Sequence, residues 1–162
     1  MNMVRLADCA FVPWRNGGGR TRELLAWPRA DAWLVRVSVA EIEADGPFSP
    51  FPGIDRCFAV LEGAGVELAL PTGMARLGPS DDAVFFAGEA APGCRLINGP
   101  TRDLNLMARR DAGTVSMQRT PPSTGTAPWR GLFADDTLWW TDVPTEALPS
   151  HGSGWWLTLG TR

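Results

Sequence analysis

The residues best suited to chemistry in this sequence are arginines that start or interrupt short, strand-like apolar runs. In residues 33–39, Arg36 and Ser38 fall on one face of an extended strand, while valines fall on the other. Arg56 begins a second run of this kind. Because a guanidinium pairs with a carboxylate through two parallel hydrogen bonds, Arg36 and Arg56 are the candidate anchors for a small anion. A sheet with one solvated face would show the same alternation without any function.

Three consecutive glycines mark a second segment of interest, Pro13-Trp14-Arg15-Asn16-Gly17-Gly18-Gly19. Such a run loses backbone entropy and buries nothing, so it favours a sharp turn or the close approach of a ligand. Its amides, with Arg15, Arg20 or Arg22 near them, are able to hold an anion. The spacing matches neither a P-loop nor a dinucleotide-binding fingerprint, and a tight surface turn with solvated arginines is the alternative interpretation.

Two further segments supply candidate walls and polar groups for a pocket. Residues 45–56 contain three prolines, which stiffen the chain, and present Phe48 and Phe51 from an irregular loop. In residues 103–107, Asp103, Asn105 and Met107 share one face of a predicted strand, opposite two leucines. A rigid aromatic loop beside a barrel mouth suits a ligand site, although phenylalanines that only cap the core would give the same sequence.

Composition excludes several classes of function. The chain has no lysine, which rules out Schiff-base chemistry, and its formal net charge of -3 argues against a nucleic-acid surface. Its one histidine, His151, cannot supply the multi-histidine ligand set of an iron, manganese or nickel site, so we expect no metal and no cofactor. Cys9, Cys57 and Cys94 lie far apart in apolar stretches, which is typical of buried thiols. No apolar run approaches the roughly 20 residues of a membrane span and no signal peptide is evident, so the expected location is the cytoplasm.

Short β-type runs separated by glycine and proline predict an all-β protein, a sandwich or barrel. The predicted strands cover residues 33–39, 57–61, 66–70, 83–86, 94–97, 104–107, 114–117, 138–141 and 155–159. Glu62-Gly63-Ala64-Gly65 is expected to close a hairpin between two of them. The best helix candidates are short, at residues 21–26 and 132–135. We expect one compact body over residues 1–162, in which residues 120–162, beginning with a Pro/Ser/Thr-rich loop at 120–125, complete the fold begun by residues 1–119.

These segments together resemble the HutD/Ves family. The resemblance rests on residues 13–23, 37–41, 45–49, 51–56, 61–63 and 98–107, which occur in the family's order and fall within residues 3–110. It implies a cupin of bicupin type, with two small β-barrels in one body and without the cupin metal ligands. Members are linked to histidine utilisation or, in the Ves branch, to stress responses. Leu104 replaces the family's usual phenylalanine, and the chain is short after Leu70, so the second barrel is expected to be trimmed.

The resemblance also gathers the candidate residues into one pocket. Arg36 and Arg56 would pair with a carboxylate, and Glu23 would accept an imidazole or amide N–H. The remaining expected ligand contacts are of three kinds. Neutral hydrogen-bond partners would be Asn16, Thr21 and Asn105, and loop glycines would be Gly17 and Gly18. The aromatic walls would be Trp14, Phe48 and Phe51.

Three functions are compatible with these residues. The first is a metal-free, non-catalytic protein that binds a small carboxylate metabolite, an intermediate of histidine breakdown, in a sensing or regulatory role. The second is a metal-independent isomerase or hydrolase that uses Glu23 or Glu41 as a general base. The third is an interaction module, such as a homodimer, whose tryptophans mark the contact surface. Turnover of a candidate ligand separates the first function from the second.

Overall fold

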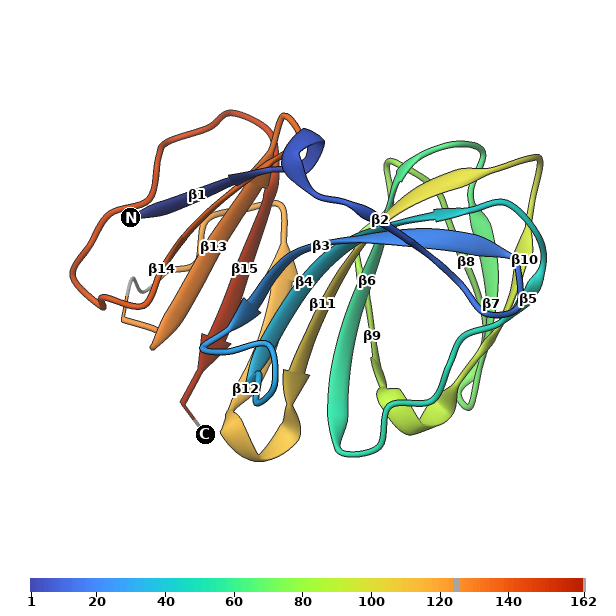
Figure 1. The fold of residues 1–162 in the computed structure, drawn as a ribbon, viewed down its shortest axis with the longest axis horizontal. Helices are drawn as coiled ribbons and strands as arrows, with labels where there is room; N and C mark the ends of the chain where they lie inside the picture. The colour runs from blue at the N-terminus through green and yellow to red at the C-terminus, as the bar shows by residue number, and fades with distance from the viewer. Residues whose placement is uncertain (124–125, 162) are drawn as a thin grey trace.

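A computed structural model describes residues 1–123 and 126–161, which form three antiparallel sheets stacked side by side (Figure 1). Between the strands lie short 3₁₀ helices, η1 (Leu6–Asp8), η2 (Gly88–Ala90) and η3 (Arg110–Ala112). The predicted all-β class is confirmed. Within the described residues, no helix has the length and apolar character needed to cross a membrane.

The central layer is a six-stranded sheet that carries most of the candidate residues. Its strand order is β2-β3-β4-β11-β6-β9. The bounds are Phe11–Pro13 for β2, Gly19–Trp27 for β3, Val35–Ile42 for β4, Thr101–Arg109 for β11, Ile54–Glu62 for β6 and Val84–Ala87 for β9. All neighbours are antiparallel, and side chains alternate between the two faces of the sheet except where the register shifts, between Glu23 and Leu25 in β3 and between Arg102 and Asp103 in β11.

A four-stranded sheet covers one face of the central sheet, on the right in Figure 1. Its order is β5 (Gly46–Pro47), β10 (Gly93–Leu96), β7 (Val66–Leu70) and β8 (Gly73–Leu77). Phe58 and Val60 of the central sheet share a buried apolar cluster with Val66 and Leu68 of this one. The two sheets thus enclose a barrel-like interior.

A five-stranded sheet covers the other face. Its order is β1 (Asn2–Arg5), β14 (Thr137–Thr141), β13 (Trp129–Ala134), β15 (Trp155–Gly160) and β12 (Thr114–Gln118). Val37, Leu104 and Leu106 of the central sheet pack against Trp129 and Leu157 in a second buried cluster. The predicted loop at 120–125 precedes β13, and its last two residues, 124 and 125, lie outside the described residues.

The polar face of the central sheet is not a solvated face. Ser38 and Asn105 are only 4% and 5% exposed, because the four-stranded sheet and two loops cover them. The interpretation of a sheet with one wet side is therefore wrong, and these polar groups lie inside the protein.

Both short helices predicted from the sequence are wrong. Residues 21–26 belong to β3, which pairs with β2 and β4, and residues 132–134 belong to β13. In β3 the register shifts between Glu23 and Leu25, so a bulge interrupts the alternation. Leu24 and Leu25, although consecutive, both pack against the same core. Two adjacent apolar residues facing one side mimic a helical pattern in the sequence.

The hairpin predicted at residues 62–65 is also wrong. Gly63 and Gly65 have the expected positive φ angles, +101° and +117°. However, β6 pairs with β11 and β9, whereas β7 pairs with β8 and β10. The glycines therefore carry the chain from the six-stranded sheet into the four-stranded one.

The two glycines that flank β7 give a matched stability test. A Cβ on Gly65 would lie 2.2 Å from the carbonyl oxygen of Leu77, whereas a Cβ on Gly73 (φ +128°) would meet nothing within 4 Å. Gly73→Ala should lose about 1 kcal/mol of unfolding free energy from backbone strain alone, and Gly65→Ala about 3 kcal/mol. Urea denaturation of both variants measures the difference, and equal losses would contradict a close approach at Gly65.

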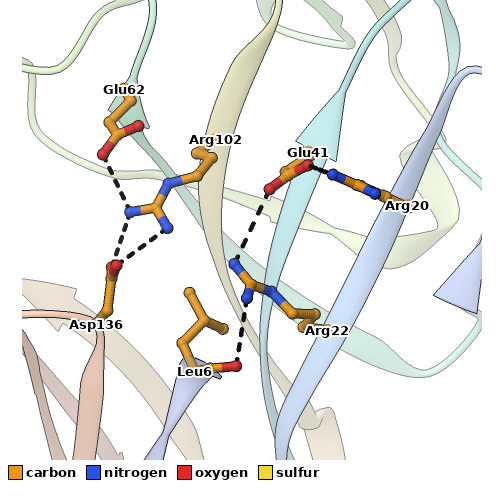
Figure 2. Close-up of polar contacts among 7 residues, drawn as sticks. All are labelled: Leu6, Arg20, Arg22, Glu41, Glu62, Arg102 and Asp136. Carbon is orange, nitrogen blue, oxygen red and sulfur yellow. Dashed lines mark hydrogen bonds and ion pairs between the residues drawn. The ribbon is translucent and has the colours of Figure 1, made fainter. Parts of the chain in front are cut away.

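Polar contacts of β3, β4 and β11, inner strands of the central sheet, help to fix this sheet to the five-stranded sheet and to η1 (Figure 2). Asp136, in the turn between β13 and β14, accepts hydrogen bonds from Nη1 and Nη2 of Arg102 at 3.3 and 2.8 Å. Arg22 Nη1 donates to the carbonyl oxygen of Leu6 at 3.4 Å. Glu41 binds Arg20 at 2.7 Å and Arg22 at 3.9 Å. Glu41 is thus held between two arginines, and each of these three side chains already has a partner within the protein.

Candidate functional site

A cavity of about 500 Å³ opens between the polar face of the central sheet and residues 12–16 and 47–51, which are the ends of β2 and β5 with the two loops that follow them. Nine of the eleven predicted ligand contacts line it, namely Trp14, Asn16, Thr21, Glu23, Arg36, Phe48, Phe51, Arg56 and Asn105. These residues come from β3, β4, β6, β11 and the two loops, and they surround one site. Gly17 and Gly18 are not among the lining residues, so direct contact between these glycines and a ligand stays a prediction.

The glycine segment positions the wall of this cavity. The Gly18 amide donates to Asn16 Oδ1 at 2.9 Å, so this amide already has an acceptor. A Cβ on Gly19 would lie 2.5 Å from the Glu41 carbonyl oxygen and 3.2 Å from the Trp14 ring. Glycine is required there chiefly because the backbone of β4 at Glu41 lies too close for a side chain, and the indole of Trp14 also lies against this position.

Aromatic side chains form a continuous wall from the mouth inward. Trp14 meets Phe48 edge-on, with ring centroids 6.5 Å apart, and Phe48 lies 5.4 Å from Phe58. The Trp14 indole N–H donates to Thr21 Oγ1 at 2.8 Å, which holds the indole in place. The Thr21 hydroxyl therefore keeps its own hydrogen for another acceptor.

Arg56 is a buried cation at the inner end of this wall. It is 5% exposed, and its Nη2 donates to Asn105 Oδ1 at 2.8 Å. Its guanidinium carbon lies 5.2 Å from the ring centroid of Phe48, 5.5 Å from that of Phe51 and 5.1 Å from that of Phe86. Among the described residues no carboxylate pairs with it, and its buried Nε has no hydrogen-bond partner.

The charge of Arg56 persists at neutral pH. Burial, together with the smaller effect of the nearby positive charge of Arg36, lowers the pKa of Arg56 to about 10. Since this pKa still lies well above 7, the guanidinium stays protonated. An unpaired cation in an aromatic, water-poor site is an unusual arrangement, because buried charges normally have a counter-charge.

Arg36, the second predicted anchor, already has a carboxylate. Its Nε donates to Glu23 Oε1 at 2.8 Å, and both side chains are partly exposed at the cavity. Glu23 therefore neutralises Arg36, which leaves Arg56 as the stronger of the two anion anchors.

Strand register explains why these groups meet. Arg36, Met107 and Arg56 are opposite one another across β4, β11 and β6. The two arginines are thus two strand spacings apart, roughly 9–10 Å along the sheet. The neighbouring row places Ser38 between Glu23 and Asn105.

Asp103 lies on the same face of β11, one step deeper than Asn105. Its side chain is fully buried, Oδ2 accepts a hydrogen bond from the Thr101 hydroxyl at 2.9 Å, and Oδ1 has no partner among the described residues. Burial raises the pKa of Asp103 to about 7, against the opposing effect of the Thr101 hydrogen bond. Its cross-strand neighbour Ala40 lines the cavity, so Asp103 is adjacent to the site without forming its surface.

A larger hollow of about 660 Å³ lies elsewhere, among residues 30–33, 52–54 and 109–111. Its charged groups are paired: Arg109 with Asp111 at 2.7 Å, and Arg110 with Asp55 at 2.8 Å. The smaller cavity is the better candidate because it contains the unpaired cation.

The residues present do not fit a cupin-type metal centre. Within residues 1–123 and 126–161, no three His, Cys, Asp or Glu side chains converge on one point. His151 lies outside the cavity, with Nε2 2.8 Å from Asp135 Oδ2.

Some cavity residues were not selected from the sequence. Ser38, Phe58 and Met107 line it, although the alternation in their strands was visible. The signal that identifies them is a shared face with Arg36, Arg56 and Asn105 in paired strands, which requires the register as well as the sequence.

A family model described as HutD matches residues 6–144. The chain belongs to the HutD family. Among its relatives, one described as an uncharacterized 21.2 kDa protein in the hutC 3'region of Pseudomonas putida is 37% identical over 109 residues, and Protein Ves of Citrobacter koseri is 38% identical over 100. These matches cover 66% and 60% of this chain, but 57% and 52% of the relatives. The chain thus matches little more than half the length of these two proteins.

Solved structures agree with the HutD assignment. HutD from Pseudomonas fluorescens SBW25 superposes with a TM-score of 0.86 and 26% identity, covering 99% of this chain and 98% of that one. The cupin domain of Cnp3 from Schizosaccharomyces pombe superposes with a TM-score of 0.51 and 14% identity over 64% of this chain and 71% of that one, which shows the fold alone. The predicted HutD/Ves resemblance and cupin-like fold are confirmed. The division into two barrels stays a prediction.

Proposed function

We propose that this HutD-family protein binds a small carboxylate metabolite, an intermediate of histidine breakdown, and acts as a metal-free sensor in the cytoplasm. The observation that carries the proposal is Arg56, a buried guanidinium that faces a cavity and has no carboxylate partner among the described residues. A ligand carboxylate would supply the missing counter-charge.

Neutral hydrogen-bond donors that line the same cavity as Arg56 support the same ligand class. Asn105 turns its carbonyl oxygen toward Arg56, which leaves its amide N–H groups for an acceptor. Thr21 and the buried Ser38 add hydroxyl groups on neighbouring strands. The aromatic wall of Trp14 and Phe48 suits a flat or planar ligand body.

The acid–base groups favour binding over catalysis. Glu41, one candidate base, is held by Arg20 and Arg22 and does not line the cavity. Glu23, the other, is ion-paired with Arg36. The choice of histidine breakdown rests on the HutD relationship and on the printed description of the Pseudomonas putida relative.

A single charge substitution tests this site. Asn105→Asp places a carboxylate next to Arg56 inside the cavity, so the internal pair should exclude external carboxylates and weaken binding by at least about a hundredfold. The measurement is calorimetric titration with histidine, urocanate, formiminoglutamate and N-formylglutamate. Asn98→Asp, which adds the same charge at an exposed position outside the cavity, is the matched control.

The outcomes separate the candidate functions. Saturable binding that Asn105→Asp abolishes and Asn98→Asp retains supports the carboxylate site, and mass spectrometry of the mixtures shows whether the ligand is converted. Arg56→Ala should lose binding as well. No heat with any of the four compounds, in folded protein, would remove histidine catabolites from consideration.

A further inference from the structure

The ionisable side chains of the cavity are few and unequally placed. Arg56 is buried, whereas Glu23 and Arg36 are 43% and 26% exposed and form an ion pair. The remaining lining cation, Arg15, is exposed at the mouth, where water screens its charge. The interior therefore offers one uncompensated positive charge.

Glu23 is the residue that limits this charge to one. Without its carboxylate, Arg36 and Arg56 would present two cations from strands two spacings apart on one sheet face, an arrangement suited to a dicarboxylate. With Glu23 in place, a second ligand carboxylate reaching Arg36 would have to approach a like charge. Only Oε1 of Glu23 contacts Arg36 within the described residues, so Oε2 is available to accept an N–H from a ligand.

We infer that Glu23 determines ligand specificity, so that the cavity selects monocarboxylates with an N–H donor at the opposite end and rejects dicarboxylates. This inference rests on the proposed function, because it presupposes that a carboxylate binds at Arg56. It adds the charge class of the ligand and the residue that sets it.

Pairs of compounds that match in shape and differ in charge provide the test. Glutaramate and glutarate form a flexible pair, and 4-carbamoylcinnamate and 4-carboxycinnamate form a flat pair. For each pair that the wild-type protein binds, we expect the affinity for the amide to be at least about tenfold higher than the affinity for the dicarboxylate. The amide avoids repulsion at Glu23 and donates an N–H.

Two variants at the ion pair should change this preference in opposite directions. Glu23→Gln leaves Arg36 unpaired and should raise dicarboxylate affinity about tenfold, removing or reversing the preference. Arg36→Gln leaves Glu23 unpaired and should increase the preference for the amide. Glu43→Gln removes one negative charge at an exposed position outside the cavity and should behave as wild type.

Each result bears on the inference. If the wild-type protein binds the dicarboxylates as tightly as the amides, or if Glu23→Gln keeps the wild-type preference, the inference is overturned while the carboxylate site stands. If the wild-type protein binds neither these compounds nor the four metabolites, both the inference and the proposed function are overturned.

Discussion

As pH rises from about 4 to about 8, Asp103 should cost the wild-type protein about 4 kcal/mol of unfolding free energy, and the Asp103→Asn variant should not show this loss. Asp103 is fully buried, and burial raises its pKa from the usual 3.8 to about 7. Between these values the folded protein holds a proton that the unfolded chain has released. Unfolding free energy therefore falls as pH rises through this window, and the fall is complete above about pH 8.

The measurement is the difference in unfolding free energy between Asp103→Asn and wild type, obtained by urea denaturation at several pH values. The comparison cancels the other carboxylates, which are common to both proteins. Asp82→Asn, at an exposed position, is the control and should follow the wild-type curve. Parallel curves for Asp103→Asn and wild type would show that Asp103 does not titrate in this range.

Trp129→Ala should destabilise the protein by about 3–5 kcal/mol. Trp129 is fully buried and belongs to the core between the central and five-stranded sheets. A Cβ on Gly131 would lie 2.9 Å from the indole, so the strand itself leaves room for this ring. Truncation to alanine therefore leaves a cavity that the neighbouring strands cannot readily fill.

Trp129→Phe separates packing from hydrogen bonding. The indole Nε1 of Trp129 is buried and has no hydrogen-bond partner among the described residues, so its removal forfeits no bond. We expect Trp129→Phe to lose less than half as much stability as Trp129→Ala in the same chemical denaturation series. Equal losses for the two variants would contradict a purely packing role.

The sequence was informative where alternation is regular. In β4 and β11 the valines and leucines face one core, and Arg36 and Asn105 face the cavity, as the period of two predicts. It failed at the β3 bulge, because an extra residue places Leu24 and Leu25 against the same core. It also failed at Gly63 and Gly65, whose φ angles suit a hairpin as well as a passage between sheets.

The site was predicted in composition but not in electrostatics. The resemblance to the HutD/Ves family, rather than the residue types alone, placed Trp14, Phe48 and Arg56 in one expected pocket, and all three line the same cavity. The ion pair of Arg36 with Glu23 depends on the register of β3 against β4, including the bulge, which no local pattern encodes. The burial of Asp103 likewise depends on the four-stranded sheet that covers it.

The pairing of the first strand with a late one has a consequence for biosynthesis. Residues 2–5 form β1, yet their partners are residues 137–140 of β14. All strands of the cavity have been synthesised by residue 109, whereas the five-stranded sheet requires almost the entire chain. On the ribosome, the face with Val37 and Leu106 therefore emerges before the sheet that covers it, and this interval is when a chaperone would be needed most.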